Sequence, residues 1–243
     1  MASLSFRHDN MLLALGREVV PKLREFKPQE LSNYVWALAT TDLVDNFSLH
    51  AVSGELFRRG ADELAVWDPQ SLANLMWAYA TLAVKDDELF ELLVTASLCR
   101  IADFNCQELA NSTWATAMVL FRRSAFLTAI AERAVCKMED MSPMHLAQLA
   151  WAFSRFGFRA DDVGLLPALA AETLRRCGEF SPQSLADVQD ALAFFGVLSA
   201  GAPGAAEVRL DTLDRQVRSC LSSFAASRDP GHAQVYRKEL EGF

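Results

Sequence analysis

The sequence lacks the long apolar run that a membrane-spanning helix needs. No stretch of its 243 residues reaches roughly 18 consecutive apolar residues, so we predict no transmembrane segment. The first twenty residues have neither a basic start nor a small-residue cleavage site, and we expect no secretory signal. Glycine (11) and proline (8) are scarce, which argues against a fibrous or disordered chain.

The motifs of catalysis and of metal binding are also missing. None of the four histidines lies in an HExxH motif, and the chain has neither a GxSxG motif nor a glycine-rich phosphate loop. The five cysteines are odd in number and form no CxxC pair, which argues against a zinc site or a disulfide framework. We therefore expect no enzyme activity, no cofactor, no metal and no small-molecule substrate.

Charge is distributed unevenly along an acidic chain whose net charge is −8. Residues 42–103 hold four basic and eleven acidic residues, whereas residues 104–160 hold six basic and four acidic ones. An acidic total argues against nucleic-acid binding, because neutralising phosphates usually supplies most of the affinity. The mildly basic middle keeps that function open.

Five segments repeat along the chain, four of them centred on a tryptophan. They align on the anchor residues Trp36, Trp77, Trp114, Trp151 and Asp190, which are 41, 37, 37 and 39 residues apart. The segments lack strand alternation, so this period is typical of stacked helical hairpins rather than of propeller blades. We predict an all-α, right-handed α-solenoid of about five hairpins and about ten or eleven helices over residues 1–226. A flexible tail is expected at 227–243.

Each repeat opens with the signals of a helix N-terminus. Four repeats begin with a capping side chain, namely Asp68, Asn105, Ser142 and Ser181. Four have proline at the first helical position, namely Pro28, Pro69, Pro143 and Pro182. All five pair a large apolar residue before the cap with a leucine at N4, which is a hydrophobic staple; the leucines are Leu31, Leu72, Leu109, Leu146 and Leu185. These signals predict a first helix in each repeat, and the amphipathic segments 86–104, 124–141 and 162–180 predict second helices.

The repeated motif resembles the octotricopeptide repeat of algal organelle proteins. It is also similar to repeats of FAST-kinase-like, RAP-associated and heptatricopeptide proteins, and of RNA-editing substrate-binding complex subunit 6. The resemblance covers roughly residues 10–225 and rests on PQELSNYVWALA, PQSLANLMWAYA, CQELANSTWATA, PMHLAQLAWAFS and PQSLADVQDALA. It implies RNA binding in a mitochondrion or chloroplast.

Polar residues recur at fixed distances from each anchor. Seven residues before it lie Gln29, Gln70, Gln107, Met144 and Gln183; three before it lie Asn33, Asn74, Asn111, Gln148 and Asp187; one after it lie Ala37, Ala78, Ala115, Ala152 and Ala191. Because these positions are four apart, they share one face of the first helix. The amides could hydrogen-bond nucleotides. Alternatively, they could bond the next helix as an inter-repeat ladder, which we favour for the asparagines because they are nearly invariant.

Other candidate residues are judged by their surroundings. Leucine and alanine flank each anchor tryptophan, so we expect core packing rather than base stacking. Cys99 and Cys136 fall at the same place in successive second helices, which also favours core packing. Three arginine pairs could hold phosphates. Arg122–Arg123 lies in a turn of the basic middle and is the best candidate, whereas Arg58–Arg59 and Arg175–Arg176 are expected on a solvated outer face.

The sequence therefore favours an organellar RNA-binding protein that acts in transcript processing, stability or translation, with single-stranded RNA as its partner. A protein-binding scaffold of the same fold is the alternative, and the negative net charge favours it.

Overall fold

The computed structural model describes residues 9–196, so the last part of the predicted solenoid (197–226) and the predicted tail at 227–243 lie outside this range. Within it the chain forms ten α-helices and no strand, which confirms the all-α class. After α1 (Asp9–Val19) come the first helices of the repeats, here called A helices: α2 (Pro28–Thr40), α4 (Pro69–Thr81), α6 (Cys106–Met118), α8 (Pro143–Phe156) and α10 (Pro182–Phe194). The second, or B, helices are α3 (Asn46–Leu64), α5 (Asp87–Arg100), α7 (Ser124–Cys136) and α9 (Leu165–Arg175). Short 3-10 helices span Val20–Glu25, Ile101–Asp103, Met138–Asp140, Asp161–Val163 and Cys177–Glu179.

The A helices begin as the sequence predicts. The side chains of Asp68, Asn105, Ser142 and Ser181 each accept a hydrogen bond from the backbone N–H three residues on. In α2 the cap is Lys27, whose side chain makes no such bond; Glu30 instead accepts from the Lys27 N–H at 2.7 Å. The five staple leucines are all fully buried. The caps and staples therefore fix where each A helix starts and which face it turns to the core.

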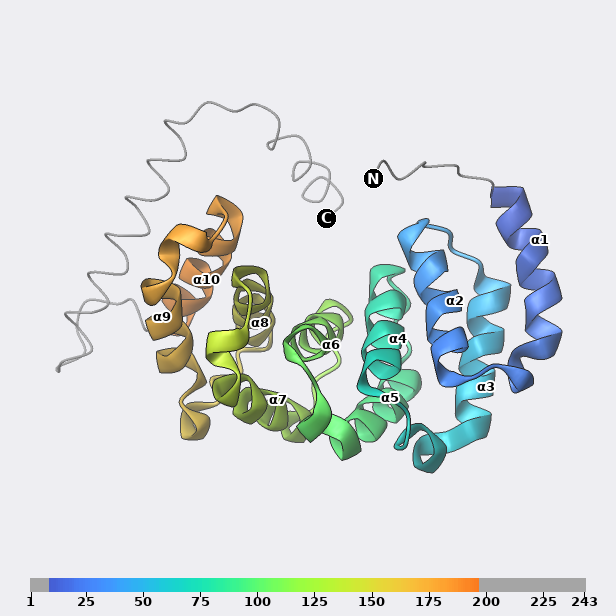
Figure 1. Ribbon diagram of the computed structural model, residues 1–243, viewed down its shortest axis with the longest axis horizontal. Helices are drawn as coiled ribbons and strands as arrows, with labels where there is room; N and C mark the ends of the chain where they lie inside the picture. The colour runs from blue at the N-terminus through green and yellow to red at the C-terminus, as the bar shows by residue number, and fades with distance from the viewer. Residues whose placement is uncertain (1–8, 197–243) are drawn as a thin grey trace.

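The helices form two layers of an arc, with the A helices on its inner side and the B helices on its outer side (Figure 1). Each A helix packs along its length against the next one, and small side chains permit this close approach. The alanines that follow the anchors of α4, α6 and α8 are fully buried, whereas Ala37 in the first A helix is exposed. The fold is thus a helical repeat; the right-handed superhelix stays a prediction.

The turn between an A helix and the next element has the same backbone in every repeat. The sixth residue after the anchor is left-handed each time, with φ between 51° and 69°; these residues are Asp42, Ala83, Leu120, Gly157 and Gly196. In the first four turns the following N–H donates to the carbonyl five residues earlier, as in Leu43 to Leu38 at 3.0 Å and Phe121 to Thr116 at 2.9 Å. This bond is that of a Schellman motif, which ends the helix and redirects the chain.

The cysteines contradict one expectation. Cys99 and Cys136 are exposed on the B helices, so they are not core residues. Their shared place in the repeat reflects the same helix register on the outer surface, not shared burial. Within residues 9–196 no helix is long and apolar enough to cross a membrane.

Candidate nucleic-acid interface

Each A helix exposes one narrow face, which we call the inner stripe. It consists of positions −7, −3, 0 and +4 relative to the anchor, which lie within about 60° of one another around a helix of 3.6 residues per turn. Neighbouring A helices cover the two flanks, and the B layer covers the back. The remaining face therefore lines the inside of the arc (Figure 1). Residues at −7 are exposed in all five repeats.

The asparagines at −3 do not form the inter-repeat ladder that we favoured. Asn33 is exposed, Asn74 and Asn111 are partly exposed, and none of their amides hydrogen-bonds another residue in the range 9–196. The polar contact between α2 and α4 is instead made by the Ser32 hydroxyl, which donates to the Ser71 hydroxyl at 3.4 Å. The amides are therefore free to bind a ligand.

The fourth and fifth repeats change the chemistry of the stripe. In α8, Gln148 replaces asparagine, and its Oε1 is buried without a hydrogen-bond partner among the described residues. In α10 the stripe turns acidic, with Asp187 and an exposed Asp190. Burial raises the pKa of Asp187 although the Gln183 amide donates to its carboxylate at 2.8 Å. The part of the stripe that holds no carboxylate thus runs from α2 to α8.

The anchor tryptophans meet the expectation of core packing only in part. Trp36 is 45% exposed, and Trp77, Trp114 and Trp151 pack only partly against the core. Trp36 is more exposed because no A helix precedes it. The fully enclosed tryptophan is Trp67, which is 3% exposed and belongs to a staple rather than to an anchor position. Flanking leucines indicated burial wrongly because the leucine at −5 and the anchor lie about 140° apart around the helix.

The arginine pair that looked most suitable for phosphates is largely engaged within the protein. Arg123 forms an ion pair with Glu91 of α5 and donates to the Thr95 hydroxyl at 2.6 Å. Arg122 is exposed and stacks over the Phe158 ring, 5.9 Å from its centroid. Only Arg122 is therefore open to a ligand, and it lies in a turn rather than on the stripe.

The two other arginine pairs correct a second expectation, because one member of each is not solvated. The side chains of Arg59 and Arg176 are 5% and 14% exposed, whereas those of Arg58 and Arg175 are 47% and 60% exposed. Arg59 donates to the carbonyls of Leu23 at 3.2 Å and of Phe26 at 2.7 Å. The inner member of each pair is an inter-repeat link.

Arg176 repeats this arrangement in the fourth hairpin. It donates to the carbonyl of Met141 at 2.7 Å, just before an A helix begins, and it contacts Glu172 at 3.2 Å. Hydrogen bonds from Arg175 and Arg176 hold the pKa of Glu172 below its usual value. Hydrogen bonds from Arg58 and Arg59 lower the pKa of Glu55 to about 2. These carboxylates are therefore ionised structural partners at neutral pH.

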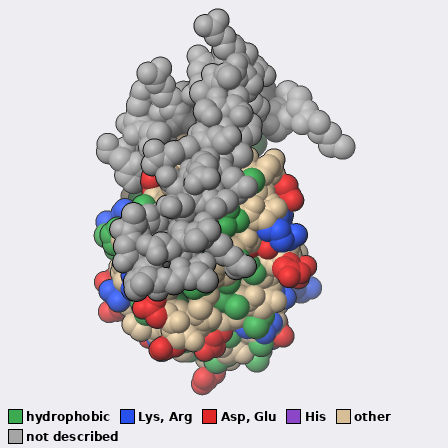
Figure 2. Space-filling model, turned by 90° about the vertical axis from the view of Figure 1, so that its left-hand side faces the viewer, with side chains coloured by type: hydrophobic (Ala, Val, Ile, Leu, Met, Phe, Trp, Pro, Cys, Tyr) green, Lys and Arg blue, Asp and Glu red, His purple; other side chains and the backbone are tan. Residues whose placement is uncertain are grey.

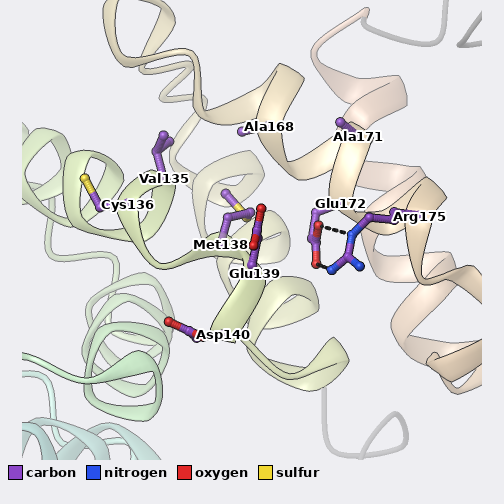
Figure 3. Close-up of a pocket in the computed structure, with 9 residues that line it drawn as sticks. All are labelled: Val135, Cys136, Met138, Glu139, Asp140, Ala168, Ala171, Glu172 and Arg175. Atoms are coloured by element: carbon purple, nitrogen blue, oxygen red, sulfur yellow. Dashed lines mark hydrogen bonds and ion pairs between the residues drawn. The ribbon is translucent and has the colours of Figure 1, made fainter.

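A hollow of about 400 Å³ lies on the outer layer between the end of α7 and α9 (Figure 3). Glu172 and Arg175 lie side by side on α9, at one side of the hollow, and are hydrogen-bonded. A second hollow between the Val20–Glu25 helix and α3 has the same construction, with Glu55 and Arg58 in the equivalent places. Each hollow is lined by the exposed arginine of a pair and not by the arginine that makes the inter-repeat link. In the described part of the chain, no group of three His, Cys, Asp or Glu side chains could hold a metal ion.

The inner stripe carries little charge, and the one described cation on it is Arg155 of α8. Its guanidinium lies over the Trp151 ring, 5.5 Å from the centroid, and donates to the Ala117 carbonyl at 3.2 Å. The sequence reasoning missed this residue because it considered only arginine pairs. At the α9–α10 end, acidic and basic side chains are interspersed wherever grey atoms do not cover them (Figure 2). We see no strongly basic patch there that could attract phosphates by itself.

Residues 47–162, just under half of the chain, match the model of a family described as RNA-editing substrate-binding complex 6 protein. The match spans α3 to the end of α8 and so includes the second, third and fourth anchors. It connects the chain with a helical family associated with RNA editing. A search of curated proteins found no match.

Proposed function

We propose that this protein binds single-stranded RNA along the inner stripe of its A helices and acts in RNA processing. The observation that carries the proposal is the row of asparagine amides at the same place in α2, α4 and α6, which have no hydrogen-bond partner among residues 9–196. An amide offers both a donor and an acceptor, which suits the edges of bases that are not paired.

The family match supports RNA processing as the setting, because the family's description names an RNA-editing complex. We place the activity in the mitochondrion, one of the two organelles that the resemblance implies; the match adds nothing in favour of a chloroplast. The protein would hold a transcript and recruit or exclude other factors, without enzyme activity of its own.

A protein-binding scaffold is the second candidate. A row of amides with few charges also suits the backbone of an extended polypeptide, and the net charge of −8 favours a basic partner over a phosphate backbone. The two candidates differ in whether RNA binds at all.

Binding of a labelled single-stranded RNA, followed by fluorescence anisotropy over a range of salt concentrations, tests the proposal. Because Arg155 is the one described cation on the stripe, the slope of log affinity against log salt should be shallow, no steeper than about −1.5. A slope much steeper than about −3 would place the RNA on another, basic surface. If no RNA binds even in low salt, RNA binding is wrong and the scaffold replaces it.

Amide variants identify the surface. The double change Asn74→Ala and Asn111→Ala should weaken binding by about 5- to 150-fold, since each neutral hydrogen bond contributes about 0.5–1.5 kcal/mol. The melting temperature should hardly change, because these amides make no hydrogen bond with the rest of residues 9–196. Asn46→Ala, an exposed asparagine at the start of α3 on the outer layer, is the matched control and should bind normally.

A further inference from the structure

We propose that the four anchor tryptophans are stacking platforms for unpaired bases, so that the stripe recognises bases rather than the phosphate backbone. This inference rests on the proposed RNA binding and specifies what is recognised. It concerns Trp36, Trp77, Trp114 and Trp151, which occupy the same position in four successive A helices.

Partial exposure is the first reason. Trp67, which packs in a staple, is 3% exposed, whereas Trp36 keeps 45% of its surface open. The three other anchors are packed along part of the ring and open along the rest. An indole held in this way is rigid and partly desolvated, which are the conditions under which base stacking contributes most.

The neighbours of each indole are the second reason. One turn before it lies the amide at −3, which makes no hydrogen bond within the described part of the chain, and two turns before it lies the exposed residue at −7. Each of the first three repeats therefore combines a planar ring for a base face with an amide for a base edge. Few positive charges accompany this set, so the bases rather than the phosphates must supply the affinity.

The spacing of the indoles selects an unpaired strand. Helices packed side by side lie about 8–10 Å apart, whereas stacked bases follow one another at about 3.4 Å. A continuous base stack cannot meet an indole at every base, because the platforms are two to three times further apart. The strand must therefore be free to spread its bases, which excludes a duplex.

The series ends at the fourth repeat. Arg155 stacks on Trp151 there and provides a guanidinium beside the last indole, where it can neutralise a phosphate. In α10 the anchor is Asp190 and Asp187 occupies −3, so the next repeat offers two carboxylates and no indole. The bound strand is thus expected to cover α2 to α8 and to stop before α10.

The test compares two strands of equal length and charge: an oligouridylate of about 12 nucleotides and the same ribose-phosphate chain without bases. The unmodified protein should bind the oligouridylate at least about tenfold more tightly, with quenching of tryptophan fluorescence. Trp36→Ala should weaken oligouridylate binding by about 5- to 150-fold. Its matched control is Phe57→Ala on the outer layer, where the phenylalanine is 41% exposed, close to the 45% of Trp36; this variant should bind normally.

Three results are decisive. Loss with Trp36→Ala and weak binding of the baseless strand support stacking, provided that the variant melts within a few degrees of the unmodified protein. Equal binding of the two strands, or normal binding by Trp36→Ala, overturns stacking while leaving RNA binding in place. If neither strand binds at all, RNA binding itself is wrong, and the stacking inference is lost with it.

Discussion

Replacing Arg59 by alanine should destabilise the protein more than any other single arginine change in the first hairpin. Its buried guanidinium donates to Glu55 at 2.7 Å and to the carbonyls of Leu23 and Phe26, and it lies over the Trp67 ring at 5.5 Å. These contacts join α3 to the segment that precedes α2. The link therefore holds one repeat to the element before it.

The magnitude follows from the contacts that disappear. Two hydrogen bonds from a charged donor to carbonyl oxygens contribute about 1.5–3 kcal/mol each, and the contact with the ring adds about 1 kcal/mol. Glu55 keeps Arg58 as a partner after the change, so its charge is not left unpaired. These contributions add up to about 4–7 kcal/mol, and because contacts made by one side chain are not fully additive, we expect a loss at the lower end, about 4–5 kcal/mol, within the range for removing one partner of a buried ion pair. The melting temperature should fall by roughly 10 °C.

Arg58→Ala is the matched control, because Arg58 binds the same carboxylate but is 47% exposed. Its removal should lower the melting temperature only slightly. Hydrogen exchange should also show that Arg59→Ala loosens residues 20–31 first, since those residues lose their tie to α3. If the two variants lost equal amounts of stability, the link would be refuted, because the hydrogen bonds from Arg59 to the carbonyls would then contribute nothing measurable.

The remaining predictions concern burial, backbone strain and acid. Trp67→Ala should lower the free energy of unfolding by about 3–5 kcal/mol, as large-to-small changes in a core do. Trp77→Ala should lower it clearly less, because its ring is only partly buried. If chemical denaturation gave the reverse order, the assignment of the anchor tryptophans to the stripe would be wrong. Leu120→Gly should stabilise by about 0.5–1 kcal/mol because Leu120 is left-handed and 54% exposed, whereas Gly157→Ala in the equivalent turn should destabilise by a similar amount. Since the pKa of Glu55 is lowered to about 2, its pairing stabilises the protein above the unfolded-state value of 4.5 and is lost as the pH falls from there towards 2. Glu55→Gln should flatten that part of the acid-unfolding curve, and unchanged acid sensitivity would show that Glu55 does not cause it.

Much of the fold could be predicted because its signals are local. Caps, staples and prolines act within one turn of a helix, so Asp68, Pro69 and Leu72 locate the start of α4 without knowledge of the rest. The turns between A and B helices were harder to predict from the sequence. Glycine marks the left-handed residue only at Gly157 and Gly196, while Asp42, Ala83 and Leu120 adopt the same conformation without that mark.

The errors concern which face of a helix meets which neighbour. Periodicity shows that Leu72 and Asn74 lie on different faces, but whether Asn74 meets the next helix or the interior of the arc depends on how hairpins stack. For the same reason, Cys99 and Trp36 were wrongly predicted to be buried, and Arg59 was wrongly predicted to be solvated. A repeated residue indicates a repeated environment, and only the packing of successive repeats tells whether that environment is a core, a link or a surface.

The net charge of the protein is a poor guide to the charge of the inner stripe. Within residues 9–196, the guanidiniums of the basic middle are mostly held by the protein's own groups: Arg123 by Glu91, Arg133 by the Ala102 carbonyl, and Arg159 by Asp161 and the Phe195 carbonyl. The number of basic residues therefore overstates the positive charge that phosphates would meet. The negative net charge does not argue against RNA binding at the inner stripe either, because the first four repeats hold no carboxylate at −7, −3, 0 or +4. Affinity there must come from amides and indoles, which favour unpaired bases. Weak dependence on salt and strong dependence on bases are thus two consequences of one arrangement, and an RNA complex that showed the opposite pair of properties would have to lie elsewhere on the molecule.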